Sequence, residues 1–219
     1  MSAFTGRHIM VDLETFSLGK DATFTQIGAV AFYPERGEVS LTERFNRFVD
    51  IGSSLGMGRS FDPGTMLWWM QQSDDARWAL INGQKIAVPV PEALLDFAKF
   101  CSEGPGKRGM GNRPVEPDGV WSHGSVFDIA ILEDAYARCG LRRPWHYVKA
   151  YDTRTIFAMS DPLVGTGRGT DKWEPDRNAH EALSDAVEQA YDLLMGLHAL
   201  DRGPDVVRYG DPAPGMPKL

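Results

Sequence analysis

The chain has 219 residues, which is enough for one α/β domain with long loops or for a domain followed by a tail, and 42% hydrophobic residues can fill its core. A net charge of −7 argues against a protein that coats nucleic acid non-specifically, although bound metal ions let an acidic chain bind phosphates. The sequence has no apolar run long enough to span a membrane, and its first residues lack the apolar core of a signal peptide.

The first elements predicted are strands. Residues 8–14 alternate, so that one face carries Ile9, Val11 and Leu13 and the other carries Met10, Asp12 and Glu14. Thr25–Tyr33, stopped by Pro34, and Glu43–Val49 are predicted as the second and third strands. Short turns between the three predict an antiparallel meander.

Helices dominate the rest of the chain. An Asp62-Pro63 cap precedes the first of them, Gly140 is a left-handed C-terminal cap candidate, and Asn178 and Glu181 have capping-box spacing. One short strand, Val120–His123, interrupts the series. The predicted helices are Gly64–Gln72, Asp74–Ile81, Pro91–Cys101, Val126–Cys139, Asp152–Met159 and Ala179–Leu200.

The two cysteines, Cys101 and Cys139, have apolar neighbours in predicted helices, which is typical of buried free thiols. We therefore expect a reducing, cytoplasmic location. Glu103–Gly119 and Ser160–Arg177 are predicted as long irregular loops, and residues 201–219, with four prolines, as an extended tail after a domain of residues 1–200. A Gly-x-Gly-x-x-Gly match at 104–109 follows a predicted helix, which argues against a dinucleotide site.

Asp12 and Glu14 are two residues apart on the first strand, so both side chains leave the same face. Carboxylates in that arrangement repel each other unless a cation or a proton lies between them. The pair therefore suggests a metal site, although acidic pairs at strand ends also occur by chance.

Asp128 lies in the first turn of a predicted helix, directly after a buried strand. An aspartate there often does no more than interact with the helix dipole. A strand-to-helix connection, however, delivers that first turn to the carboxyl edge of the sheet, where a ligand can bind.

His180 and Asp185 flank the start of the last predicted helix. Five residues along an ideal helix separate two side chains by about 140°. They can face one site only if His180 lies at or before the first turn, which is where the capping signal places it. A lone histidine at such a position is otherwise a cap or a surface residue.

These acidic positions, taken in order, resemble the motifs of the DEDDh-type 3′–5′ exonucleases, a group that includes RNase T and oligoribonuclease. The matching segments are Asp12-Leu13-Glu14-Thr15, Phe127-Asp128 and His180-Glu181-Ala182-Leu183-Ser184-Asp185-Ala186, the last of which fits the pattern His-x-Ala-x-x-Asp-Ala. Trp68–Ser73 with Ala76-Arg77, and Asp152–Thr155, resemble a phage-type, exonuclease VIII-like or DexA-like group within that family.

The resemblance implies an α/β, ribonuclease-H-like fold, with a mixed central sheet of three antiparallel strands and parallel additions, flanked by helices. It implies two divalent cations, Mg²⁺ or Mn²⁺, held by Asp12, Glu14, Asp128 and Asp185, with His180 as general base. The substrate would be single-stranded 3′ ends, DNA favoured over RNA, cut to nucleoside 5′-monophosphates. Its predicted contacts are Thr15, Phe16, Trp69 and Arg154.

Relatives of this kind are often dimers, and a homodimer is accordingly one expectation. Other functions account for less of the pattern. A non-catalytic end-binding module has no use for His180, a haloacid-dehalogenase-like phosphatase would have Asp in place of Glu14, and a glycosidase built on Asp12 and Glu14 leaves Asp128 and Asp185 unexplained.

Overall fold

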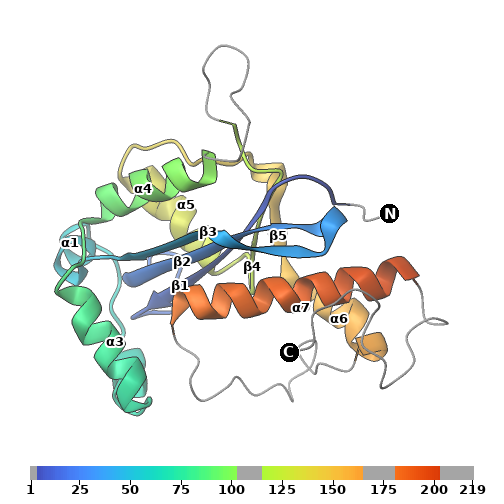
Figure 1. The fold of residues 1–219 in the computed structure, drawn as a ribbon. Helices are drawn as coiled ribbons and strands as arrows, with labels where there is room; N and C mark the ends of the chain where they lie inside the picture. The colour runs from blue at the N-terminus through green and yellow to red at the C-terminus, as the bar shows by residue number, and fades with distance from the viewer. Residues whose placement is uncertain (1–3, 103–114, 165–180, 203–219) are drawn as a thin grey trace.

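The computed structural model describes residues 4–102, 115–164 and 181–202. A five-stranded mixed sheet forms its centre, with strand order β3-β2-β1-β4-β5 (Figure 1). β1 pairs antiparallel with β2, and β2 with β3, whereas β4 runs parallel to both β1 and β5. The strands are β1 His8–Thr15, β2 Phe24–Tyr33, β3 Glu38–Phe48, β4 Gly119–Ser122 and β5 Ala150–Asp152. The predicted fold class, three antiparallel strands followed by parallel additions, is confirmed.

Helices cover both faces of this sheet. α4 and α5 lie on one face and α7 crosses the other, with α6 beside it (Figure 1). The helices are α1 Ile51–Gly56, α2 Pro63–Met70, α3 Asp74–Gln84, α4 Val90–Ser102, α5 Asp128–Arg138, α6 Thr153–Val164 and α7 Ala182–Arg202, with short 3-10 turns at Pro34–Arg36 and Tyr147–Lys149. None of the helices in the described ranges is long and apolar enough to cross a membrane.

The alternation of β1 divides the core in two. Ile9, Val11 and Leu13 pack with buried residues of α4 and α5, whereas Met10 packs with buried residues of α7. Both layers exclude water from the strand, so the side chains that follow Met10 on the α7 face are brought under that helix. Asp12 and Glu14 are the next two residues on this face.

Several elements differ from the sequence-based expectation. α6 continues to Val164, so the helix includes the first residues of the segment predicted as an irregular loop from Ser160. α1 was not anticipated, although Asp50 caps it by accepting a hydrogen bond from the Ser53 amide. β5 is only three residues long and exists because it pairs with β4, a long-range contact that a local pattern does not encode. β3 begins at Glu38 and not at Glu43, which lengthens the hairpin with β2.

The start of α7 also corrects a prediction. The helix begins at Ala182, three residues later than expected, and Glu181 itself caps it: its Oε2 accepts from the Ser184 amide at 2.9 Å and from the Ser184 hydroxyl at 2.7 Å. The capping box expected from Asn178 is therefore wrong. Asn178 and His180 lie outside the described residues, as do the tail after residue 202 and the glycine-rich segment 104–109.

Two local predictions are confirmed. Gly140 follows α5 with a left-handed φ of 64°, as a C-terminal cap requires. Cys101 is a buried free thiol, and Cys139 is a partly buried one.

Candidate metal centre

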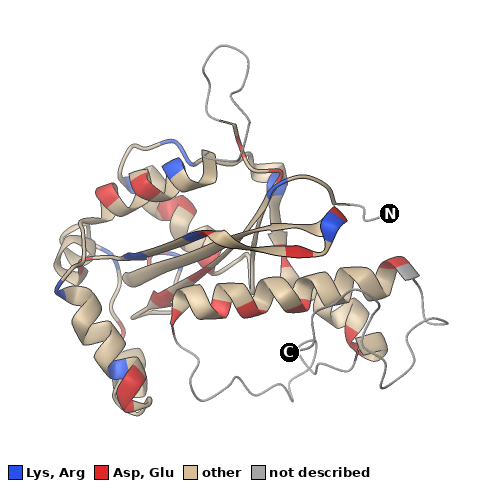
Figure 2. Ribbon diagram, in the orientation of Figure 1, with Lys and Arg blue, Asp and Glu red and all other residues tan. Residues whose placement is uncertain are grey.

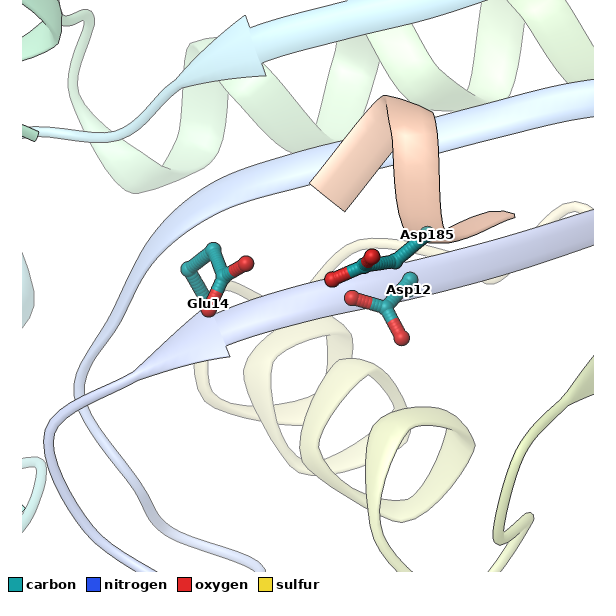
Figure 3. Close-up of side chains that lie close together, drawn as sticks. All are labelled: Asp12, Glu14 and Asp185. Carbon is teal, nitrogen blue, oxygen red and sulfur yellow. The ribbon is translucent and has the colours of Figure 1, made fainter. Parts of the chain in front are cut away.

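Three carboxylates from opposite ends of the chain meet where β1 ends. Asp12 and Glu14 come from β1 and Asp185 from the first turn of α7, and oxygens of all three lie within 4.8 Å of one another (Figure 3). Glu14 is 8% exposed, whereas Asp12 and Asp185 are partly buried. The structure thus brings together three of the four carboxylates that the sequence singled out, in one compact group.

Gly28 allows α7 to approach β1 and β2 this closely. Gly28 pairs with Asp12 across the β1–β2 ladder. A Cβ atom on Gly28 would lie 2.1 Å from the backbone carbon of Ala182 and 2.1 Å from the backbone nitrogen of Leu183. Because real contacts are never that short, any side chain at this position would push the first turn of α7, and Asp185 with it, away from Asp12.

The fourth carboxylate, Asp128, enters from the α4–α5 side of the molecule. It is the first residue of α5 and is 3% exposed. Its carboxyl group accepts a hydrogen bond from its own amide and from that of Leu13, and the positive charge of Arg154 also acts on it. Asp128 therefore reaches β1 next to Asp12 and Glu14, as the position at a helix start predicted.

Burial and mutual repulsion shift the proton affinity of this group. The pKa of Asp12 is raised well above its ordinary value, first by burial and then by the charges of Asp128, Glu14 and Asp185. Burial, followed by the charges of Asp185 and Asp128, raises the pKa of Glu14 to about 8. Burial also raises the pKa of Asp128 to about 7, against the hydrogen bonds it accepts. Near neutral pH Glu14 is therefore largely protonated and Asp128 about half protonated unless a cation lies among these carboxyls.

One further residue of the site was not anticipated. Gln189 Nε2 donates a 2.8 Å hydrogen bond to Asp12 Oδ1, and the glutamine is 7% exposed. It lies one helical turn after Asp185, so the i, i+4 spacing on α7 was the available signal. The hydrogen bond holds the Asp12 carboxyl in a fixed orientation and lowers its pKa slightly against the larger raising effects.

The donor set fits a hard divalent cation. It consists of carboxylate oxygens, which suit Mg²⁺ or Mn²⁺ better than zinc. Glu14 Oε1 is buried and has no hydrogen-bond partner, although buried carboxylate oxygens normally have one. A cation between Glu14 and its neighbours would satisfy this oxygen and offset the repulsion among Asp12, Glu14 and Asp185.

The residues predicted to contact substrate differ in their exposure to solvent. Thr15 is buried, and its hydroxyl donates to the Ser17 carbonyl. Phe16 and Trp69 are 3% and 4% exposed, pack against each other, and leave little ring surface for a base. Arg154 is exposed and its guanidinium lies against Gly124, near Asp128. His180 lies outside the described residues.

Comparison with known sequences connects this site with one protein family. Residues 7–194 match the family described as the Rv2179c-like 3′-5′ exoribonuclease domain, which is most of the chain and spans all four carboxylates and His180. No curated protein matches the chain by sequence.

Solved structures share the fold at low identity. The nuclease domain of 3′hExo, a DEDDh family member bound to rAMP, matches with a TM-score of 0.54 at 12% identity, over 95% of this chain and 98% of that domain. A zinc-bound complex of E. coli ExoI with ssDNA matches with a TM-score of 0.60 at 14% identity, over 91% of this chain and 41% of that one. Cell-death related nuclease 4 matches with a TM-score of 0.60 at 11% identity, over 91% of this chain and 65% of that one. This chain therefore spans about two fifths of the ExoI chain, and these likenesses establish the ribonuclease-H-like fold.

Proposed function

We propose that this chain, which belongs to the Rv2179c-like family of 3′-5′ exoribonuclease domains, removes nucleotides one at a time from the 3′ end of single-stranded nucleic acid and releases nucleoside 5′-monophosphates. The observation that carries the proposal is the group formed by Asp12, Glu14 and Asp185, whose oxygens lie within 4.8 Å of one another. A buried group of like charges with raised pKa values is costly to the fold, and a site for divalent cations accounts for it.

Asp12, Glu14, Asp128 and Asp185 would hold two cations, Mg²⁺ or Mn²⁺. When bound, such cations neutralise phosphate charge and lower the pKa of water. The chain's own contribution is to hold the four carboxylates in place: Gln189 orients Asp12, and the Leu13 amide orients Asp128. His180 is proposed as the general base that takes the proton of the attacking water, because its ordinary pKa lies near neutrality.

The substrate strand would lie along the aromatic side chains beside the end of β1. Phe16 packs against Phe61, with ring centroids 5.2 Å apart, and Trp69 against Trp68 at 5.5 Å. Phe61 and Trp68 are 40% and 43% exposed. We propose that these two outer rings stack on bases, and that the buried Phe16 and Trp69 support them from beneath.

Arg154 would bind a phosphate of the strand. Its amide donates to Asp152 Oδ1 at 2.9 Å, while Asp152 Oδ2 accepts from the Ser125 amide at 2.8 Å. This pair of hydrogen bonds ties the start of α6 to the loop before Asp128. The Arg154 guanidinium is thereby placed at the edge of an acidic site, where an anionic substrate needs a positive charge.

RNA is the first substrate to test, because the matched family is described by exoribonuclease activity. The preference for DNA expected from the sequence has the weaker support, since the ssDNA in a neighbouring structure is that protein's ligand. A dimer and a cytoplasmic location stay predictions.

The test is digestion of 5′-labelled RNA and DNA of the same sequence with Mg²⁺, with Mn²⁺ and with EDTA. The expected result is a ladder that shortens from the 3′ end, is abolished by EDTA, and forms faster on RNA. Asp12→Asn, which keeps the size of the side chain, serves as the inactive control. Binding without cleavage would instead indicate an end-binding module, and equal rates with EDTA would exclude a metal-dependent exonuclease.

A further inference from the structure

Two amide side chains on the sheet reach the start of α7. Gln26 pairs with Glu14 across the β1–β2 ladder, and Asn46 pairs with Gly28 across the β2–β3 ladder. Paired residues in a sheet point to the same face. Gln26 and Asn46 therefore share the face of the sheet that carries Asp12 and Glu14, one and two strands away from the carboxylates.

Both amides bind one carboxylate oxygen. Gln26 Nε2 donates to Glu181 Oε1 at 2.7 Å and Asn46 Nδ2 donates to the same oxygen at 2.9 Å. Gln26 Nε2 also donates to Asn46 Oδ1 at 2.8 Å, and the Ala182 amide donates to Gln26 Oε1 at 3.5 Å. The three contacts that reach Glu181 and Ala182 join residues 135 to 156 positions apart in the chain.

The other oxygen of Glu181 caps α7. Oε2 accepts from the amide and from the hydroxyl of Ser184, so both carboxylate oxygens are fully used in hydrogen bonds. Glu181 is a fifth acidic residue near the site, and its charge helps to raise the pKa of Glu14. Because its acceptors are already occupied, it holds the helix start and leaves cation binding to the other four.

We infer that Gln26, Asn46 and Glu181 form a clamp that positions the first turn of α7, and with it Asp185, against Asp12 and Glu14. These three are positioning residues and contact neither substrate nor cation. This inference rests on the proposed function, because the clamp is assigned a role in binding the cations of the proposed site.

The clamp and Gly28 act together on one short segment. Gly28 has no side chain to keep α7 away from the sheet, and the hydrogen bonds of the clamp hold the start of α7 against the sheet. Asp185 is one residue past Ser184, whose amide is bound by Glu181. Without the clamp, the Asp185 carboxylate can move away from Asp12 and Glu14. Even a small displacement of a group in a site of this kind lowers the function of the site.

The test measures Mn²⁺ affinity of the full chain by titration calorimetry and amide exchange of the peptide that contains Ser184. Glu181→Ala and Asn46→Ala should each weaken Mn²⁺ binding by about tenfold, the usual value for a hydrogen bond to a charged group. Both should speed exchange at the start of α7. Asn46→Asp should weaken Mn²⁺ binding further, because it places a second negative charge next to Glu181 Oε1.

Controls separate positioning from charge and from folding. Glu188→Ala removes an exposed acidic residue of the same helix and should leave Mn²⁺ affinity unchanged. Glu181→Gln, which keeps an acceptor for the two amides, should retain more affinity than Glu181→Ala. The double variant Asn46→Ala/Glu181→Ala should be no weaker than Glu181→Ala alone, since both act on one contact.

Faster exchange with unchanged Mn²⁺ affinity would make the clamp purely structural and would overturn the inference, as would no change in either. The proposed function fails separately: a wild-type chain that binds Mn²⁺ without cutting RNA or DNA would refute the nuclease and leave the clamp standing. A wild-type chain that binds no Mn²⁺ would refute both the proposed function and the role of the clamp in cation binding. The exchange data would still show whether the clamp stabilises the start of α7.

Discussion

Two regions of this protein bury formal charge, and they do so in opposite ways. Arg59 has a fully buried side chain that binds Asp134 at 3.1 Å and the carbonyls of Ala22 and Ile131 at 2.8 and 3.3 Å. At the end of β1, by contrast, oxygens of Asp12, Glu14 and Asp185 lie within 4.8 Å of one another, and the buried Glu14 Oε1 has no hydrogen-bond partner. In the first region every charge is compensated within the chain.

The difference distinguishes a structural charge from a functional one. Burial lowers the pKa of Arg59, but Asp134 counteracts that effect, so the pair serves the fold. At the end of β1, burial and the neighbouring charges act in the same direction and raise the pKa values of Asp12 and Glu14. Strongly raised pKa values of this kind are characteristic of binding and catalytic centres. Figure 2 shows how acidic residues also recur along α7 beside it.

The largest expected effect comes from removing a ligand. Asp12→Ala or Asp185→Ala should lower the rate of hydrolysis by about 10³-fold or more, because cation stabilisation is worth several kcal/mol. The measurement is single-turnover cleavage of a 5′-labelled oligonucleotide, together with Mn²⁺ affinity. More than a tenth of the wild-type rate in either variant would contradict the assignment of these ligands.

A loss of the general base should be nearly as large. His180→Ala should lower the rate by about 10²–10⁴-fold, the usual contribution of a positioned base. Affinity for single-stranded substrate, measured by fluorescence anisotropy, should stay similar. If affinity falls as much as the rate does, His180 anchors substrate and another group takes the proton.

Arg59→Met should lower the stability of the protein and leave cation binding at the acidic site unchanged. The substitution leaves the carbonyls of Ala22 and Ile131 without their donor, while Asp134 keeps its 2.7 Å contact with Arg138. The free energy of unfolding should fall by about 3–5 kcal/mol, because each buried carbonyl left without a partner costs about 1–3 kcal/mol. Urea denaturation measures this change. Arg47→Met, which breaks the partly exposed Arg47–Asp96 pair, is the control and should cost under about 1 kcal/mol. An equal loss from both would remove the distinction drawn above.

Repulsion among the buried carboxyls should make the stability of the metal-free protein depend on pH. Asp12, Glu14 and Asp128 have raised pKa values in the folded state, so the fold retains protons that the unfolded chain releases. Stability should therefore fall as pH rises from the ordinary values of these groups to about 7 for Asp128 and about 8 for Glu14. Thermal unfolding in EDTA between about pH 4 and pH 9, which covers this window, measures the loss.

The same experiment has two matched additions. Saturating Mg²⁺ should remove most of the loss, because a ligand at 100 times its Kd adds about 2.7 kcal/mol. Asp12→Asn should raise the metal-free melting temperature at pH 8, whereas Glu188→Gln, on the exposed side of α7, should change it little. A melting temperature indifferent to pH, Mg²⁺ and Asp12→Asn would contradict the convergence of these carboxylates.

Local patterns were sufficient for much of the architecture. Alternation along β1 placed Asp12 and Glu14 on the face opposite Ile9, Val11 and Leu13, and the structure has them there. The strand before α5 correctly put Asp128 in a first helical turn. These predictions succeed because periodicity and helix starts depend on neighbouring residues in the chain.

Predictions that needed distant neighbours were weaker. α1, β5 and the cap of α7 were missed or misassigned, and the aromatic rings of Phe16 and Trp69 are more buried than a stacking role requires. Burial of a ring depends on which other segments cover it. For Phe16 these are Phe61 and Trp69, about fifty residues away in the printed sequence.

The sequence by itself determined the acidic residues, their order, the strand that carries Asp12 and Glu14, and the first helical turn that carries Asp128, because those features are encoded over a few residues. Tertiary structure alone decided that the carboxylates converge, since this depends on Gly28 admitting α7 to the sheet, on the Gln189–Asp12 hydrogen bond across 177 residues, and on the clamp around Glu181. Such contacts form only when the chain has folded and the cost of bringing distant segments together has been offset by packing.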